Sequence, residues 1–220
     1  MRALVAGGLS VAVMKPVAAG AVATAQGPRN EDALALLAAA NVRAEYSLVN
    51  PYCLDAPISP HLAAREQGIA IEIDRIAQAF AALARRAQCV VVEGAGGWLA
   101  PISDRQSMAD LARALDLPVL LVVGLRLGCL SHAQLTARAI AADGLRLGGW
   151  IANHLDPAFE PLMENVATLE RLLARPPLGF IPHEAADRAG ASGRPPASPL
   201  DARERPPLSV DALLGLLGAT

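Results

Sequence analysis

Lysine, cysteine and aromatic residues are scarce in this 220-residue sequence. Lys15 is its only lysine, and the other basic residues are arginines that form no stripe with interleaved aromatics. Aromatic residues make up 3% of the chain, and the formal net charge is -2. Nucleic acids and anionic membranes attract positively charged surfaces, so this composition argues against both as partners.

Disulfide frameworks, metal-binding cysteine pairs and membrane spans are also missing. Cys53, Cys89 and Cys129 are isolated and show no CxxC or metal-ligand spacing, which favours reduced structural thiols. No apolar run is long enough to span a bilayer, and glycine and serine interrupt the apolar start, so no signal peptide is evident. We therefore expect a cytoplasmic protein.

Short apolar runs alternate with longer amphipathic runs along the chain. Expected strands are Leu9–Met14, Cys89–Val92, Pro118–Val123, Leu147–Ala152 and Leu178–Ile181. Expected helices are Asp32–Ala40, capped by Asn30, and His61–Gln67, Ile71–Arg86, Met108–Leu115, Ser131–Ala142, Leu162–Ala174 and Val210–Leu217. Continuous apolar runs such as Cys89–Val92 are typical of strands buried on both faces of a parallel sheet. This alternation predicts one α/β domain over residues 1–220, with a parallel β-sheet and helices on both faces. The Pro-, Gly- and Ser-rich stretch 185–207 is expected to be a mobile surface loop.

A carboxylate and a glycine run follow the strand Cys89–Val92. Glu93 opens the segment Glu93-Gly94-Ala95-Gly96-Gly97. In open parallel sheets, ligands bind beyond the carboxyl ends of the strands, where a carboxylate can hold Mg²⁺ and glycine N–H groups can approach a phosphate. The alternative is a plain turn with a solvated glutamate, and the local sequence does not separate the two.

Three other polar residues occupy similar places. Lys15 follows the first strand, where a compact ammonium can neutralise a phosphoryl or carbamate group, although an ordinary surface lysine is the alternative. Asp32 can be a second Mg²⁺ ligand or simply favour a helix start. Asn153 can hydrogen-bond to the edge of a nucleotide base through its amide, or it can simply occupy a turn.

Seven stretches follow one another in order along the chain: KPVAAG (15–20), RNEDALAL (29–36), VNPY with ISPH (49–52 and 58–61), VVVEGAGGWLAPISD (90–104), PVLLVVGLRLGCLSHAQLT (118–136), GWIANH (149–154) and LGFIP (178–182). Together they resemble the dethiobiotin synthetases. The EGAGGW and VGLRLGCLSHA blocks are the most specific. The resemblance covers most of the chain and implies a P-loop NTPase-like fold.

The resemblance also implies an activity. Members of that family use ATP, CO₂ and Mg²⁺ to close a ureido ring on 7,8-diaminopelargonate. One amine becomes a carbamate, ATP phosphorylates the carbamate, and the second amine displaces phosphate. Such catalysis depends mainly on positioning and on charge neutralisation.

Residue roles follow by position in the matched motifs. Lys15 would be the catalytic cation, and Asp32 and Glu93 would hold Mg²⁺. The nucleotide would lie along Glu93, Gly94, Ala95 and Gly96, with its adenine near Asn153, His154, Pro182, His183 and Glu184. Members are homodimers, and substrate would contact Ala19 and the Gly128, Cys129, Leu130 and Ser131 turn, where a helix start suits a carboxylate.

Two departures from the family pattern stand out. Ala19 occupies a position where the family commonly has a serine that contacts substrate. The family also opens with a strand and a GxxxxxGKT-like loop, whereas no Gly-Lys-Ser/Thr occurs in this sequence. The segment 1–8 looks like the end of the helix that follows such a loop, so we expect that roughly 20 residues, including the first strand and the P-loop, are missing from its start.

Three hypotheses remain open from the sequence. The first is a dethiobiotin synthetase read from an internal Met1. The second is a non-catalytic, P-loop-less relative that keeps a dimeric ligand-binding scaffold. The third is another P-loop protein, such as a cobyrinate-type amidotransferase or a MinD-like ATPase, against which the ISPH and GCLSHA segments weigh.

The absent phosphate loop gives the first prediction. Phosphoryl transfer depends on the backbone cradle and the lysine of that loop. We expect the 220-residue chain to show no measurable ATP-dependent dethiobiotin synthesis and a form extended by in-frame upstream codons to be active. A coupled phosphate-release assay compares the two, and robust turnover by the 220-residue chain would contradict the expectation.

Overall fold

The computed structural model describes residues 1–183 and 210–216. They fall into two compact units, which are described separately. Unit 1 comprises residues 1–117 and 143–145, and unit 2 comprises 118–142 and the described part of 146–220. The interpretation of residues 1–220 as one domain stays a prediction. Glu184 and the stretch 185–207 lie outside the described residues. No described helix is long and apolar enough to cross a membrane.

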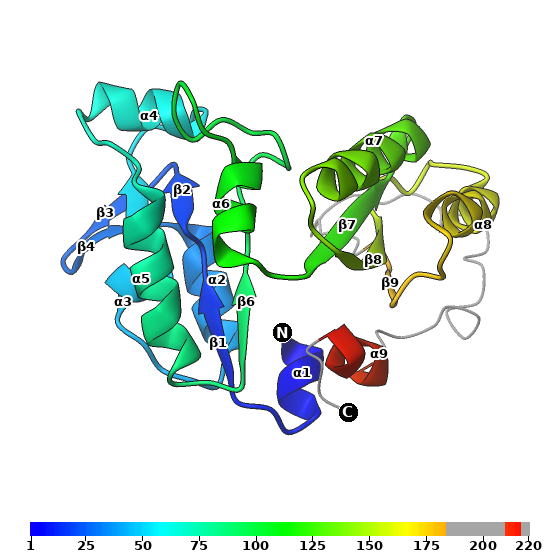
Figure 1. The fold of residues 1–220 in the computed structure, drawn as a ribbon, viewed down its shortest axis with the longest axis horizontal. Helices are drawn as coiled ribbons and strands as arrows, with labels where there is room; N and C mark the ends of the chain where they lie inside the picture. Colours follow the sequence, from blue (N-terminus) through cyan, green and yellow to red (C-terminus); the bar gives the residue numbers. More distant parts are fainter. Residues whose placement is uncertain (184–209, 217–220) are drawn as a thin grey trace, which may run out of the picture. The chain divides into compact units, whose positions relative to one another are not determined.

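Unit 1 consists of short strands with helices packed around them (Figure 1). Its elements are α1 (Arg2–Ala6), β1 (Val11–Met14), β2 (Val17–Ala19), β3 (Val22–Thr24), β4 (Gly27–Arg29), α2 (Glu31–Ala39), α3 (Tyr46–Val49), β5 (Tyr52–Leu54), α4 (Pro60–Glu66), α5 (Ile73–Ala84), β6 (Cys89–Val92) and α6 (Met108–Leu115). β1 pairs with β6 and β2 pairs with β5, both in parallel, whereas β3 and β4 form an antiparallel hairpin.

Helices cover both faces of β1. Met14 packs in one apolar cluster with Ile76 of α5, whereas Val13 packs in another with Leu36 of α2. Neighbouring residues of a strand point to opposite faces, so α5 and α2 lie against opposite sides of β1. This arrangement confirms the expected α/β class of parallel strands flanked by helices.

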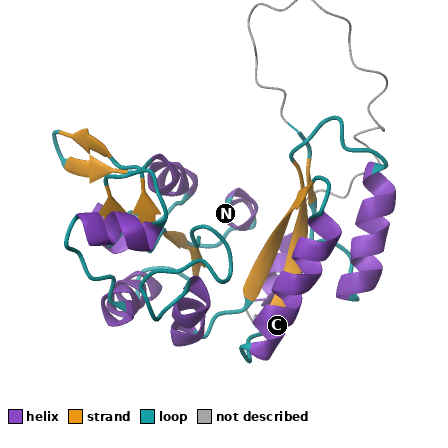
Figure 2. Ribbon diagram, turned by 90° about the horizontal axis from the view of Figure 1, so that it is seen from above, coloured by secondary structure: helices purple, strands orange, loops and turns teal. Residues whose placement is uncertain are grey.

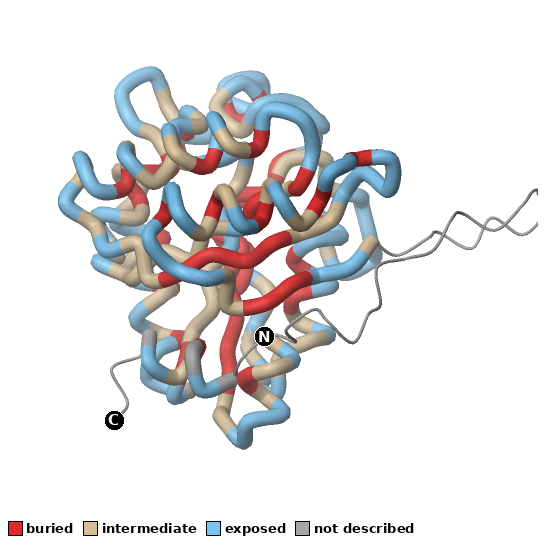
Figure 3. The backbone as a smooth tube through the Cα atoms, turned by 90° about the vertical axis from the view of Figure 1, so that its right-hand side faces the viewer, coloured by how far each residue is buried: buried red, intermediate tan, exposed pale blue. Residues whose placement is uncertain are grey.

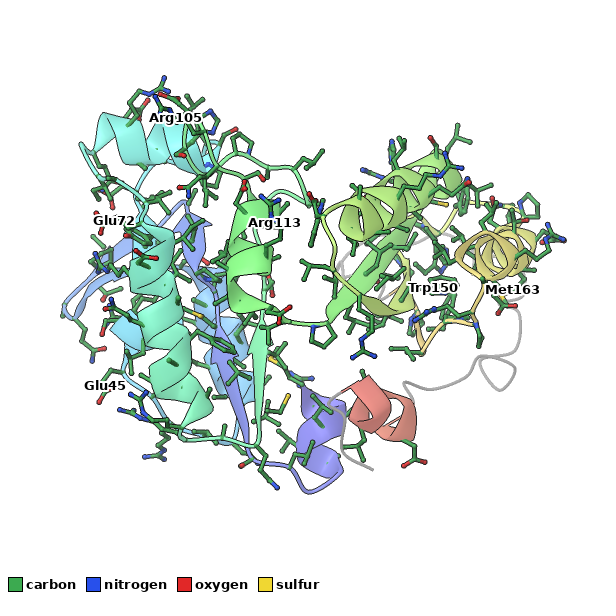
Figure 4. All side chains as sticks on the ribbon, in the orientation of Figure 1. Glu45, Glu72, Arg105, Arg113, Trp150 and Met163 are labelled. Atoms are coloured by element: carbon green, nitrogen blue, oxygen red, sulfur yellow. The ribbon has the colours of Figure 1, made fainter. Side chains whose placement is uncertain are left out.

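Unit 2 contains one three-stranded parallel sheet of order β7-β8-β9, seen with its helices in Figure 2. Its elements are β7 (Val119–Leu125), α7 (Cys129–Ala142), β8 (Leu147–His154), α8 (Leu162–Leu173), β9 (Phe180–Ile181) and α9 (Val210–Leu216). Trp150 of β8, labelled in Figure 4, is fully buried in a cluster that includes Ala133 of α7 and Leu169 of α8. Its indole N–H donates to the carbonyl of Arg175 at 2.9 Å, so the ring is both packed and hydrogen-bonded.

The expected elements are present, and their ends differ from the expectation by no more than two residues. Burial along two apolar strands differs more. In β6 only Cys89 is buried and Val90–Val92 are half-buried, and in β7 Val122 is 52% exposed. The prediction that Cys89–Val92 is buried on both faces was therefore wrong. Among the described residues β6 pairs only with β1, which leaves its other edge open (Figure 3 shows the burial along the chain).

Asn30 fixes where α2 begins. Its side-chain oxygen accepts from the N–H groups of Asp32 at 3.1 Å and Ala33 at 3.4 Å, as the expected N-cap should. Its side-chain amide donates to the carbonyl of Ala19 at 3.1 Å, and the residue is only 5% exposed. Asn30 therefore ties the end of β2 to the first turn of α2.

We expect Asn30→Ala to lower the free energy of unfolding by about 1–2 kcal/mol, because it removes a helix cap and leaves the partly buried Ala19 carbonyl without this donor. Ser59→Ala is the matched control, since Ser59 is also an N-cap residue but makes no side-chain cap hydrogen bond. It should change stability by less than ~0.5 kcal/mol. Urea unfolding measures both, and equal losses would contradict this role of Asn30.

Candidate functional site: a lysine between two carboxylates

The register of β1 and β6 brings Lys15 and Glu93 together. Met14, the last residue of β1, lies opposite Val92, the last residue of β6. The N–H of Glu93 donates to the carbonyl of Met14 at 2.8 Å, which continues the ladder past both strands. Parallel strands end at the same edge of a sheet, so the next residue of each strand reaches the same place. Lys15 and Glu93 are those residues.

Asp32 reaches the same place from α2. It is the second residue of the helix that Asn30 caps, and its Oδ2 lies 2.9 Å from Nζ of Lys15. Three elements distant in the sequence thus place one ammonium and two carboxylates together. The dipole of α2 also favours a carboxylate in its first turn, so a helix-start role and a ligand role are compatible.

The Lys15 ammonium is buried and fully engaged. Lys15 is 5% exposed. Its Nζ donates to Glu93 Oε1 at 2.6 Å and to the Gly94 carbonyl at 3.3 Å, besides the ion pair with Asp32. A buried charge is tolerated only when it is paired and hydrogen-bonded. The alternative of an ordinary surface lysine is therefore wrong.

The two carboxylates determine the protonation of Lys15. Burial by itself would lower the pKa of this lysine, but the hydrogen bonds and charges of Glu93 and Asp32 outweigh burial and raise the pKa above its ordinary value of 10.5. Lys15 therefore stays a cation throughout the physiological pH range.

The backbone of Lys15 is also held in place. Its N–H donates to the carbonyl of Val49 at 2.7 Å, and its own carbonyl accepts from Nδ2 of Asn50 at 2.7 Å. Asn50 is 3% exposed and its Oδ1 accepts from the hydroxyl of Tyr46 at 3.0 Å. Asn50 belongs to the VNPY stretch, but its role was not predicted from the sequence. An asparagine whose amide bonds a distant backbone has no local sequence signal.

A cavity of about 640 Å³ opens beside this cluster in unit 1. Every unit 1 residue that the sequence singled out as a site residue lines it. Those residues are Lys15, Ala19, Asp32, Glu93, Gly94, Ala95 and Gly96, and the other lining residues are Ala18, Ile58, Ser59, Pro60, Ala100 and Pro101. Ile58, Ser59 and Pro60 belong to the ISPH stretch, so four of the quoted stretches meet at one cavity.

The glycine segment after Glu93 needs its glycines. Gly96 has φ +74°, and a Cβ there would lie 3.0 Å from that of Ala100.

At the end of the segment, the indole N–H of Trp98 donates to Oδ2 of Asp143 at 2.7 Å. Arg113 of α6 lies 3.8 Å from the other oxygen of Asp143 (Arg113 is labelled in Figure 4). This anchor was not predicted, because Trp98 and Asp143 are far apart in the sequence.

Asp32 and Glu93 offer carboxylate oxygens, the ligand type that Mg²⁺ takes in proteins. Their side chains are 53% and 46% exposed and contact a common point, the Nζ of Lys15. Mg²⁺ takes oxygen ligands and keeps several waters, so one or two carboxylates suffice. Among the described residues, no group of three or more His, Cys, Asp and Glu side chains could enclose a metal ion. None of the three cysteines is paired in a disulfide, and Cys89 and Cys129 are buried.

Unit 2 gathers the residues expected at the adenine. Asn153, in β8, lies between Gly124 of β7 and Ile181 of β9. The His154 ring is 6.1 Å from that of Phe180 and 5.9 Å from that of His183, which with Pro182 directly follows β9. Asn153, His154, Pro182 and His183 therefore lie together at the carboxyl ends of neighbouring strands.

The expected substrate turn lies between β7 and α7 in unit 2. Gly128 has φ +93° and directly precedes Cys129, the first residue of α7. Cys129 is buried, Leu130 is half-buried and Ser131 is exposed. The first N–H groups of an α-helix have no intrahelical acceptor, so this turn can bind an anion mainly through its backbone. That the residues of units 1 and 2 surround one nucleotide and one substrate stays a prediction.

The parallel strands and flanking helices, with charged residues at the strand ends, define an α/β protein. A protein-family model described as "AAA domain" matches residues 1–187 and assigns the chain to the P-loop NTPase-like class. Among solved structures, the MinD cell division protein of Aquifex aeolicus matches with a TM-score of 0.49 and 16% identity, over 83% of this chain and 73% of that one.

Curated relatives are much more similar. An "ATP-dependent dethiobiotin synthetase BioD" of Xanthomonas oryzae pv. oryzae is 53% identical over 194 residues, covering 88% of this chain and 87% of that protein. One from Pseudomonas paraeruginosa is 53% identical over 179 residues, covering 81% and 78%. The chain belongs to the dethiobiotin synthetase family. The family resemblance is thereby confirmed, and the cobyrinate-type and MinD-like alternatives are disfavoured.

The raised pKa of Lys15 predicts a loss of stability at alkaline pH. The folded state holds the lysine proton more tightly than the unfolded state, so the stabilisation is complete below pH 10.5 and is lost as the pH rises through the folded-state pKa. We expect the stability difference between the unaltered protein and Lys15→Met to shrink above pH 10.5. Urea midpoints on both sides of that pH measure it, and a difference that does not change with pH would contradict the ion-pair account.

Proposed function

We propose that this protein is an ATP- and Mg²⁺-dependent dethiobiotin synthetase of biotin biosynthesis, which carboxylates 7,8-diaminopelargonate with CO₂ and closes the ureido ring. The observation that carries the proposal is the cavity in unit 1, where Lys15 contacts two carboxylates beside a glycine segment. Membership of the family supports the choice of substrates.

In the proposed mechanism, Lys15 faces the negative charge that develops during the reaction. A substrate amine adds to CO₂ to give a carbamate. The carbamate oxygen then attacks the γ-phosphorus of ATP and ADP leaves, and the second amine attacks the carbonyl carbon and expels phosphate. Carbamate and transferring phosphoryl are both anionic, so an ammonium beside them lowers the energy of their approach.

The other residues of unit 1 bind and orient. Asp32 and Glu93 would hold the Mg²⁺ ion, which when bound neutralises phosphate charge. Gly94, Ala95 and Gly96 would lie along the nucleotide, where the lack of bulky side chains permits close approach of the backbone. Ala19 would contact substrate from the cavity wall and offers no hydroxyl. Its carbonyl already accepts from Asn30, so its methyl group would make that contact.

Unit 2 would supply the adenine contacts and a substrate turn. Asn153 has an amide suited to a base edge, and His154, Pro182 and His183 lie beside it. Glu184, expected with them, lies outside the described residues. Gly128–Ser131 would bind the substrate carboxylate at the start of α7.

We also propose a cytoplasmic homodimer. The family resemblance implies this assembly, and Leu127, 91% exposed, and Leu135 of α7, 61% exposed, are apolar side chains open to such a contact. Both lie within or beside the substrate turn and its helix. A protein that remains monomeric in sedimentation equilibrium at micromolar concentration would contradict the dimer.

The competing function is a non-catalytic scaffold, and Lys15 discriminates between the two. In a catalytically active form of the protein, Lys15→Gln should lower kcat/KM by at least ~10²-fold, which is the scale for removing one well-placed electrostatic stabiliser. Lys15→Arg should also be impaired, since a planar guanidinium does not occupy the place of a compact ammonium. Steady-state formation of dethiobiotin from 7,8-diaminopelargonate, ATP and CO₂ measures the effect.

Circular dichroism and thermal melting are the controls, since Lys15 is buried and its removal leaves two carboxylates side by side. Near-normal kcat in a folded Lys15→Gln variant would contradict the catalytic role. Absence of dethiobiotin formation by every form of the protein would favour the scaffold.

A further inference from the structure

Three oxygen atoms of the protein surround the Lys15 ammonium. Its Nζ donates to Glu93 Oε1 at 2.6 Å and to the Gly94 carbonyl at 3.3 Å, and it forms an ion pair with Asp32 Oδ2 at 2.9 Å. A lysine ammonium has three donors, and two of them are used in these hydrogen bonds. The two carboxylates also neutralise its charge, so an anionic ligand must compete with them for the ammonium.

The carboxylates, in contrast, are accessible from the cavity. The side chain of Lys15 is 6% exposed, whereas those of Asp32 and Glu93 are 53% and 46% exposed. A cation in the cavity can therefore reach the carboxylate oxygens while Lys15 remains buried. It would bind the oxygens that Lys15 holds, and the two cations would then repel each other at short range.

We propose that Lys15 is an internal counter-cation that neutralises Asp32 and Glu93 until a divalent metal displaces it, and that the displaced ammonium then binds the anionic reactant. This inference rests on the proposed function, because it assigns the metal to these two carboxylates. Metal and anion binding are then coupled through one side chain. By thermodynamic linkage, the metal and the anion strengthen each other's binding by the same factor, because each of them favours the state in which Lys15 has left the carboxylates.

The sequence offers an unusually clean test, because Lys15 is the only lysine. An amine-reactive reagent such as trinitrobenzenesulfonate then labels two groups, Lys15 and the amino terminus, and peptide mass spectrometry separates them. In the unaltered 220-residue protein without metal, labelling of Lys15 should be slow, since the ammonium is buried and paired. Saturating Mg²⁺ should accelerate it by at least ~10-fold, while labelling of the amino terminus stays unchanged.

Metal affinity gives a second, independent measurement. Mn²⁺ binding followed by electron paramagnetic resonance should be at least ~10-fold tighter in Lys15→Gln than in the unaltered protein, and Lys15→Arg should stay near the unaltered value because it keeps the positive charge. Arg29→Gln is the matched control. It removes one positive charge three residues from Asp32, but Arg29 lies over the Tyr46 ring and makes no ion pair with either carboxylate. Its Mn²⁺ affinity should change less than ~3-fold.

The outcomes separate this inference from the function on which it rests. The inference alone would be overturned if metal bound without changing the labelling rate of Lys15 and if a folded Lys15→Gln variant bound Mn²⁺ as tightly as the unaltered protein. If Mn²⁺ bound neither the unaltered protein nor any variant, the assignment of the metal to Asp32 and Glu93 would fall, and the inference with it. The labelling experiment needs no variant, so it remains decisive even if Lys15→Gln does not fold.

Discussion

A buried ammonium must be paired, and the candidate site is organised around that requirement. Lys15 is the one strongly buried cationic side chain among the described residues, and two carboxylates and a carbonyl surround its Nζ. Leaving such a charge unpaired would cost several kcal/mol. The elements that carry Glu93 and Asp32 are therefore constrained to meet at the end of β1, where the cavity lies.

Local interactions bring Lys15, Asp32 and Glu93 together. The pairing of β1 with β6 places Glu93 opposite Lys15, and Asn30 starts α2 so that Asp32 falls in its first turn. Asn50 fixes the carbonyl of Lys15, which sets the direction in which the side chain leaves the strand. None of these supports touches a reactant in the proposed mechanism. They act by holding the Lys15 ammonium and the two carboxylates close together beside the glycine segment.

The sequence predicted the parts of the structure that have strong local patterns. Apolar runs predicted β1, β6, β7 and β8, and helical periodicity predicted α5 and α8. Burial of one or both faces of an element produces a regular pattern of apolar residues in the sequence. The three-residue strands β2 and β5 and the hairpin of β3 and β4 were missed, since so few residues carry no measurable period. Lys15, Asp32 and Glu93 were predicted from strand ends, a helix start and family motifs together.

What could not be predicted depends on contacts between distant residues. The burial of Lys15, the hydrogen bond from Asn50 and the Trp98–Asp143 anchor arise only when separate elements pack. The half-burial of β6 was also missed, because an apolar run indicates that a strand is suited to burial but does not reveal how many neighbours it has.

The central claim is that the single lysine is an ion-paired, buried cation rather than a solvated one. Nuclear magnetic resonance of protein labelled with ¹⁵N-lysine tests it directly, because only one Nζ signal can arise from this sequence. The account predicts an ammonium signal protected from exchange with water at neutral pH, which shifts and loses protection in Glu93→Gln. A rapidly exchanging signal like that of free lysine, unaffected by Glu93→Gln, would contradict it.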